Sequence, residues 1–344
     1  MNLDRLTALA GLRRHPRSPR SVLDVFRDRR AMRLVRHAYE RVPYYRELFD
    51  RYAIRPESIR AVADLAAIPI TRKRDLQLRP PSDVVARGID PARLITRRTS
   101  GSSGRPFTIR RSWIEERLLG AFRWRALHAM GLRATDRHAE IEELQPEDPS
   151  DDPRLHRALQ ALGFYRQARI HALAAPDEIL RALRRFRPDV LTGYAGVLTR
   201  LAQTMPPGNQ VRPRFVAVHS DTLTTGMRAQ IEAAFAAPVY QMYDSNEFNL
   251  IAWQCVATGA LHTCDDSTVV EVLVDGRPAA PGERGEVVLT ALHSLAMPFI
   301  RYGLGDLVIQ GERTCACGAP FATIRAVEGA VAATSLRRSR SRRS

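Results

Sequence analysis

Residues 99–106 form a compact group that could bind phosphate. Their sequence, TSGSSGRP, places four hydroxyl groups, two glycines and one arginine within eight positions. Glycine lets backbone N–H groups approach a phosphate closely, hydroxyls add hydrogen bonds, and arginine adds charge-assisted ones. The segment predicts a phosphate-binding loop, with a flexible Ser/Gly-rich turn as the alternative. The candidate ligands are Thr99, Ser100, Gly101, Ser102, Ser103, Gly104 and Arg105.

Two familiar glycine-rich motifs do not describe this loop. A Walker A loop needs a Gly-Lys-Ser/Thr sequence before a helix, and both are missing here. The segments on either side, LIT at 94–96 and FTIRRS at 107–112, are typical of strands, so the loop should join a hairpin. The G-x-S-x-G pattern of a nucleophile elbow is also missing.

Two further segments place a carboxylate among small or polar residues. The sequence YDSNE at 243–247 follows a predicted strand that ends at Met242, and RYGLGDL at 301–307 contains Asp306. Considered alone, the first segment could be a helix start capped by Asp, Ser or Asn. The second could be a glycine-containing turn between strands.

These three segments resemble, in order, the TSGSTGKP, YGSTE and MPLIRYRTGDL signatures of the adenylate-forming superfamily. That superfamily includes acyl- and aryl-CoA ligases, nonribosomal adenylation domains and luciferases. The departures from the first two signatures are Ser103 for Thr, Arg105 for Lys, Asp244 for Gly and Asn246 for Thr. The Asp244 substitution is the most disruptive, because it adds bulk and charge near the expected nucleotide.

The resemblance implies a role for each matching residue. Residues 99–105 would hold the β- and γ-phosphates of ATP, and Glu247, the catalytic candidate, would ligate Mg²⁺, which prefers carboxylate and phosphate oxygens. Asp306 would accept hydrogen bonds from the ribose hydroxyls. The residues expected to contact adenine and the acid are Tyr243, Asp244, Ser245 and Asn246.

Other segments resemble the phenylacetate–CoA ligase branch and its relatives in capsular-polysaccharide loci. They are VPYYR at 42–46, IPITRK at 68–73 and LTGY at 191–194, and the whole resemblance covers about residues 22–330. It implies an AMP-forming ligase that activates a carboxylic acid, with aryl acids favoured. ATP, Mg²⁺ and CoA would be required, and the acid would be a small molecule.

Cysteine and histidine residues near the C-terminus suggest a metal site. Cys255, His262, Cys315 and Cys317 resemble positions that some members use for structural zinc. Three thiolates and an imidazole can complete a tetrahedral site. Cys264 is a competing ligand, and four ordinary thiols are the alternative.

The resemblance also implies a C-terminal lid domain that carries a catalytic lysine. Lys73 is the only lysine here, Ala330 replaces the hinge arginine, and 331–344 has the composition of a basic disordered tail. We therefore expect the lid domain to be absent from this chain. The alternative function is a truncated or inactive ATP-binding homologue that needs a separate C-terminal domain.

Hydrophobic periodicity predicts an α/β fold with mostly parallel sheets flanked by helices and a small β-subdomain. The expected divisions are a helical part at 1–95, an α/β nucleotide-binding body at 96–265, a β-subdomain with the ribose motif at 266–330, and the tail at 331–344. Thr71 is expected to cap a helix, and 135–152 to be a loop.

Composition narrows the classes of partner. A net charge of +16 suggests nucleic acid, but the tail supplies five arginines and no nucleic-acid-binding motif is visible, so we expect a basic surface instead. No apolar run is long enough to span a membrane, and the first twenty residues do not resemble a secretory signal. These features favour a cytoplasmic protein without a membrane partner, and they leave a homodimer open.

Overall fold

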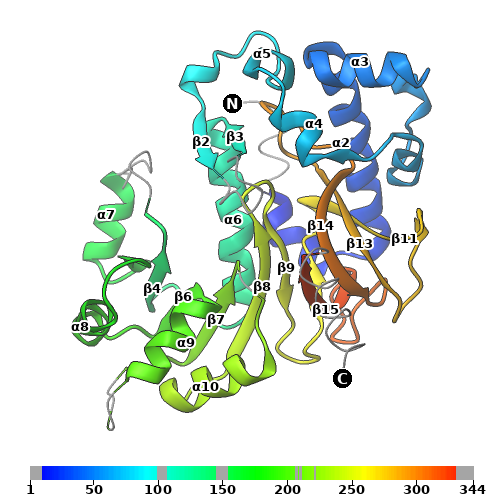
Figure 1. Cartoon of the computed structure of the whole chain (residues 1–344). Coiled ribbons are helices and arrows are strands. Elements are labelled where there is room, and N and C mark those ends of the chain that lie inside the picture. The colour runs from blue at the N-terminus through cyan, green and yellow to red at the C-terminus, as the bar shows by residue number, and fades with distance from the viewer. Residues whose placement is uncertain are drawn as a thin grey trace, which may run out of the picture. The chain divides into compact units, whose positions relative to one another are not determined.

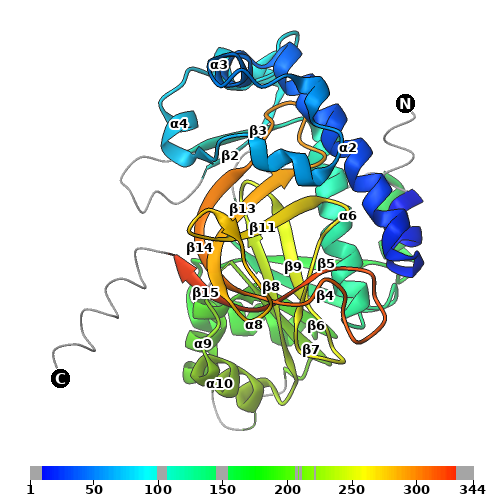
Figure 2. The ribbon, with the colours of Figure 1, turned by 90° about the vertical axis from the view of Figure 1, so that its right-hand side faces the viewer.

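The computed structural model describes residues 10–98, 107–144, 154–205, 208, 211–220 and 222–330 of the chain (Figures 1 and 2). The chain divides into two compact units. One combines Met1–Arg125 with Asp244–Ser344, and the other is Ala126–Tyr243. We call them the discontinuous unit and the central unit.

The central unit contains a parallel sheet in the order β8-β7-β6-β4-β5. Parallel neighbours require crossovers, and helices supply them here (green in Figure 1). The strands are β4 (Arg137–Glu142), β5 (Arg166–His171), β6 (Val190–Tyr194), β7 (Phe215–His219) and β8 (Val239–Ser245). The helices are α7 (Arg154–Ala161), α8 (Pro176–Phe186), α9 (Ala195–Thr204) and α10 (Thr225–Phe235).

The core of the central unit explains this arrangement. Strand β7 is buried along its whole length, as a strand covered on both faces must be. Its Val216 and Val218 join Leu191 of β6 in one apolar cluster with Leu198 of α9 and Phe235 of α10. The core of this unit therefore lies between the apolar side chains of its strands and those of its helices.

The discontinuous unit contains a mainly antiparallel sheet in the order β12-β11-β13-β14-β15-β10-β9, with β1 parallel to β14. Its strands are β1 (Thr71–Arg72), β9 (Asn249–Gln254), β10 (Leu261–Thr263), β11 (Thr268–Val274), β12 (Arg277–Pro278), β13 (Arg284–Ala291), β14 (Tyr302–Gln310) and β15 (Thr323–Ala330). A separate hairpin joins β2 (Ile95–Arg98) to β3 (Thr108–Arg111), as predicted.

The N-terminal region supplies helices, and the one at Lys73–Gln77 contacts β14. The α-helices are α2 (Arg20–Arg41), α3 (Pro43–Arg51), α4 (Lys73–Gln77), α5 (Pro81–Val84) and α6 (Trp113–Ala129). Among the described residues, 3-10 helices lie at His15–Arg17, Pro56–Ser58, Val62–Ala67 and Pro91–Arg93. Helix α2, blue in Figure 2, buries Leu23, Ala31, Leu34 and Ala38 on one side, at helical spacing.

The predicted fold class is confirmed, but two local predictions are wrong. Thr71 does not cap a helix, because it pairs with Tyr302 in β1, and Arg72 is the N-cap of α4. Residues 137–142, predicted to lie in a loop, form β4, whose Ala139 and Ile141 are fully buried. That strand is short and rich in charge, so its apolar alternation was hard to recognise. Within the described residues, no helix has the length and apolarity needed to cross a bilayer.

Candidate active site and metal centre

Glu247 lies in the short turn between β8 and β9. The turn is closed by Phe248, whose backbone N–H donates to Ser245, and Asn249 adopts a left-handed conformation with φ of 59°. The Glu247 side chain is buried, and the Tyr302 hydroxyl donates to its Oε1 at 3.2 Å. Burial and the neighbouring Glu247 charge raise the pKa of Tyr302, so the phenol stays protonated and remains a donor.

The β2–β3 hairpin is attached to this same turn. The Asn246 side-chain amide donates to the Arg98 carbonyl at 3.3 Å, and the Arg111 guanidinium donates to the Asn246 carbonyl. Glu116 of α6 accepts from Arg97 at 2.9 Å and from Arg111 at 3.1 Å. Both strands of the hairpin are therefore fixed beside Glu247.

The candidate phosphate ligands lie outside the described residues. These are Thr99, Ser100, Gly101, Ser102, Ser103, Gly104 and Arg105. Strand β2 ends at Arg98 before them, and β3 begins at Thr108 after them. Both flanking strands are hydrogen-bonded to the turn that carries Glu247.

Asp244 forms an ion pair with Arg123. Its Oδ2 lies 2.8 Å from Nη1 of Arg123 on α6, and the two side chains are only 8 % and 17 % exposed. This contact compensates the extra charge that distinguishes Asp244 from the glycine of the resembled signature. Sequence reasoning missed Arg123, because nothing in its neighbourhood marks one arginine among many.

The other residues expected near adenine and the acid differ in burial and in hydrogen bonding. Tyr243 is buried at the end of β8, in the central unit. The Ser245 hydroxyl accepts from the Phe248 backbone at 3.3 Å, so it stabilises the turn. Asn246 is exposed and its side chain bonds to the hairpin.

Asp306 lies on β14 at an irregularity in the strand. The register shifts between β13 and β14 so that three residues, 304–306, face one residue of β13, and Gly305 has φ of +88°. Such a bulge changes the direction of the following side chain. Asp306 follows Tyr302 by four residues on this strand, so the Cα atoms of the two lie within about 13 Å.

Arg301, which begins the same motif, has a structural role. Its buried guanidinium pairs with Glu271 at 3.1 Å and donates to the backbone carbonyls of Ala66 and Ile68. It connects β11, β14 and the segment that leads into β1. This arrangement fixes the start of the strand that carries Tyr302 and Asp306.

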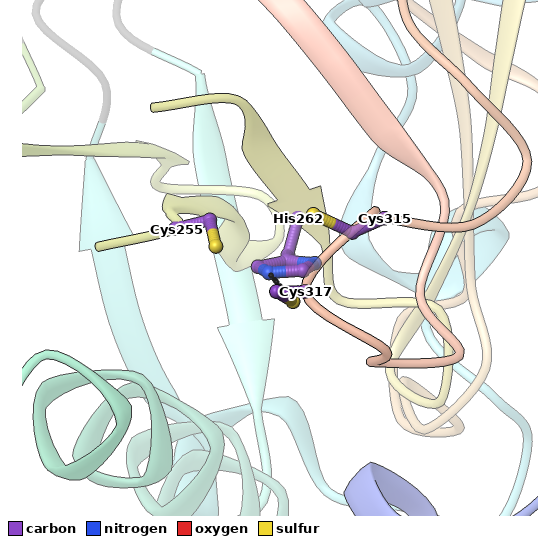
Figure 3. A group of neighbouring side chains, drawn as sticks. All are labelled: Cys255, His262, Cys315 and Cys317. Atoms are coloured by element: carbon purple, nitrogen blue, oxygen red, sulfur yellow. Dashed lines mark hydrogen bonds between the residues drawn. The ribbon is translucent and has the colours of Figure 1, made fainter. Parts of the chain in front are cut away.

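The four candidate zinc ligands come together in the discontinuous unit. One potential ligand atom from each of Cys255, His262, Cys315 and Cys317 lies within 4.8 Å of every other (Figure 3). His262 is on β10, Cys255 follows β9, and the last two lie in the connection between β14 and β15. The pairing of β10 with both β9 and β15 is what brings these distant segments together.

The geometry of the cluster suits a tetrahedral metal. His262 Nε2 lies 3.5 Å from Cys317 Sγ, and ligands about 2.1 and 2.3 Å from a tetrahedral zinc would be about 3.6 Å apart. His262 Nδ1 is buried and has no hydrogen-bond partner. Burial lowers the pKa of His262 to about 4, so its imidazole is neutral at pH 7.

Cys264, the competing ligand, belongs to a different cluster. Its sulfur lies 3.4 Å from Nη2 of Arg125 and 3.9 Å from Oδ1 of Asp266. Burial is the main cause of the raised pKa of this thiol. Arg125 also forms a two-pronged ion pair with Asp266, which accepts a further bond from His15 at 2.9 Å. Sequence reasoning missed this buried network.

Comparison with known proteins gives relatives of one kind. No protein-family model matches the chain. It is 26 % identical over 313 residues to the phenylacetate-coenzyme A ligase of Thermus thermophilus, covering 87 % of this chain and 68 % of that protein. It is 26 % identical over 311 residues to the Escherichia coli protein with the same description, covering 83 % and 66 %. The chain thus spans about two thirds of the length of these curated relatives.

Two further likenesses are more limited. Over 132 residues the chain is 29 % identical to Protein CapK of Staphylococcus aureus, which covers 38 % of this chain and 28 % of that one. A solved structure of 2-hydroxyisobutyryl-CoA ligase, in complex with 2-HIB-AMP, matches with a TM-score of 0.78 at 20 % identity. The match covers 93 % of this chain and 70 % of the other, and it shows that the fold is shared.

Proposed function

We propose a ligase function for this chain, which is a homologue of the phenylacetate-coenzyme A ligases and has the fold of the adenylate-forming CoA ligases. The chain activates a carboxylic acid, with aryl acids favoured. A carboxylate oxygen attacks the α-phosphorus of ATP, and the bond to pyrophosphate breaks to give acyl-AMP. The thiol of coenzyme A then loses its proton and attacks the acyl carbonyl, and AMP leaves.

The observation that carries this proposal is the buried Glu247 turn, hydrogen-bonded to both strands that flank residues 99–106. Residues 99–105 hold the ATP phosphates in this proposal, and Glu247 holds Mg²⁺. Tyr302 keeps one Glu247 oxygen oriented through its hydroxyl. Mg²⁺, when bound, neutralises charge on the triphosphate.

The remaining candidate residues hold the rest of the nucleotide and the acid. Asp306 accepts hydrogen bonds from the ribose hydroxyls, which a carboxylate on a strand bulge can reach. Tyr243 to Asn246 border adenine and the acid carboxylate. The Arg123 ion pair supports this part of the proposal, because it neutralises Asp244 where an unpaired carboxylate would repel phosphate.

We also propose that Cys255, His262, Cys315 and Cys317 hold a structural zinc ion. Support comes from the convergence of the four ligand atoms and from the 3.5 Å between His262 Nε2 and Cys317 Sγ. With four protein ligands the site is closed, so its role is to join β9, β10 and the β14–β15 connection.

Acid-dependent exchange of labelled pyrophosphate into ATP tests the ligase function. We expect exchange with at least one member of a panel of aryl acids, and a loss of about 10²- to 10³-fold in Glu247→Gln. Glu283→Gln, which alters an exposed glutamate paired with Arg277, is the control.

Two outcomes would count against the ligase function. Binding of ATP–Mg²⁺ without exchange for any acid would favour an ATP-binding homologue that needs a separate C-terminal domain. If calorimetry detects no binding of ATP–Mg²⁺ either, the proposed function is wrong.

A further inference from the structure

Two residues outside the signature segments connect the hairpin to the Glu247 turn. Arg111 of β3 is 3 % exposed and donates both to the Asn246 carbonyl and to Glu116 Oε2 at 3.1 Å. Glu116 also accepts from Arg97 of β2 through Nε at 3.2 Å and Nη2 at 2.9 Å. One carboxylate therefore spans both strands.

Arg97, Arg111 and Glu116 form an ion cluster on one face of the hairpin. Arg97 and Arg111 lie on strands whose pairing places Ile95 opposite Arg111 and Arg97 opposite Ile109, so both arginines point to one face. Burial would raise the pKa of Glu116, but the charges of Arg111 and Arg97 lower it. The glutamate therefore stays ionised and its bonds stay charge-assisted, which makes them short and directional.

We infer that Arg111 and Glu116 are positioning residues that hold the strands bounding residues 99–106 in register with the turn that carries Glu247. The inference rests on the proposed function, in which that segment contacts the β- and γ-phosphates and Glu247 contacts their metal ion. A triphosphate must meet both at once, so its affinity depends on the spacing between them. AMP has neither terminal phosphate, so its affinity does not.

The test compares the affinities of the full chain for ATP and AMP, with Mg²⁺, by isothermal titration calorimetry. Arg111→Gln and Glu116→Gln should weaken ATP binding about tenfold, the effect of losing one charge-assisted hydrogen bond. AMP binding should change less than twofold. Arg111→Lys keeps the charge and one contact, so it should recover part of the ATP affinity.

The matched control is Arg277→Gln, which breaks a two-pronged arginine–glutamate pair with Glu283 elsewhere in the same unit. It should leave both affinities unchanged. If circular dichroism shows that Arg111→Gln does not fold, Arg97→Gln replaces it. Arg97 is 21 % exposed, and its replacement removes the bonds that tie β2 to Glu116.

The outcomes separate the two proposals. If the wild-type chain does not bind ATP more tightly than AMP, the proposed phosphate site itself is wrong. If the wild type shows that preference but the variants keep it, or lose ATP and AMP affinity equally, the positioning role is wrong and the proposed function stands.

Discussion

At the scale of single residues, Asp244 shows how a departure from a signature is accommodated. A carboxylate that is 8 % exposed is costly unless it is paired, and Arg123 reaches it from a helix 121 positions earlier in the chain. The two residues are therefore expected to depend on each other.

Arg123→Met should lower the free energy of unfolding by about 1–3 kcal/mol, because it removes the charged partner that Arg123 provides for the buried Asp244 carboxylate. The double variant Arg123→Met/Asp244→Asn should recover at least half of that loss. Urea denaturation of the four proteins in this cycle measures the coupling. Additive losses in the double variant would show that the pair is not coupled.

At the scale of elements, the bulge in β14 decides where Asp306 lies. Gly305 has φ of +88°, a conformation that an L-residue adopts only at a cost, and a Cβ there would meet no atom within 4 Å. The effect of a substitution at Gly305 is therefore backbone strain alone.

Gly305→Ala should cost about 1–2 kcal/mol of stability. If Asp306 binds the ribose hydroxyls, the wild-type chain should bind ATP more tightly than 2′,3′-dideoxy-ATP, which lacks them. Gly305→Ala should abolish this preference, because the strand would relax and move Asp306. Gly276→Ala is the matched control, because Gly276 has φ of +82° and equally open surroundings. The control should lose similar stability and keep the nucleotide preference. An unchanged preference in Gly305→Ala would argue against ribose binding by Asp306.

A second element-scale feature is the group formed by Cys255, His262, Cys315 and Cys317, where the proposed zinc ion would add a link between segments that the pairing of β10 with β9 and β15 already brings together. Purified protein should contain one zinc per chain by elemental analysis. Chelation should lower stability, by about 2.7 kcal/mol if free zinc had been at 100 times its dissociation constant. Cys255→Ser and Cys315→Ser should lose the metal.

Cys264→Ala is the control for these variants, because Cys264 contacts Arg125 and Asp266 and lies outside the four-residue group. It should retain zinc. Metal-free protein whose melting temperature does not respond to added zinc would leave four ordinary thiols as the correct interpretation.

At the scale of the whole molecule, the buried histidine His293 makes stability depend on pH. Its Nε2 donates to the Asp266 carbonyl at 2.8 Å, and its Nδ1 accepts from Arg30 at 2.6 Å. Burial is the main cause that lowers the pKa of His293 to about 3, and the Arg30 charge adds to it. The folded state therefore keeps this ring neutral where the unfolded chain would protonate it.

The pKa in the folded state lies below the unfolded value of 6.5, so the unfolded state binds more protons between these values. The stability contribution is complete above about pH 6.5 and is lost as pH falls toward 3. Each pH unit in this window should cost about 1.36 kcal/mol. Urea denaturation at pH 6.5 and 4.5 measures how steeply the free energy of unfolding depends on pH. His293→Gln should reduce this slope by the contribution of about one proton. An equal slope in the variant would contradict this assignment.

Much of this protein follows from local sequence. The apolar run of β7, the amphipathic spacing of α8 and α10, and the paired strands around residues 99–106 are short-range patterns. The signature segments likewise identified Glu247 and Asp306 as candidates. Such features are visible because periodicity and small-residue composition depend on neighbours within a few positions.

Contacts between distant segments were decided only by the tertiary structure. Arg111 meets the Asn246 carbonyl across 135 positions, and Glu247 meets Tyr302 across 55. With 53 basic residues in the chain, no local pattern selects the one that will pair with a given carboxylate. That choice depends on which strands become neighbours and which side chains are then buried together, because only removal from water makes pairing necessary.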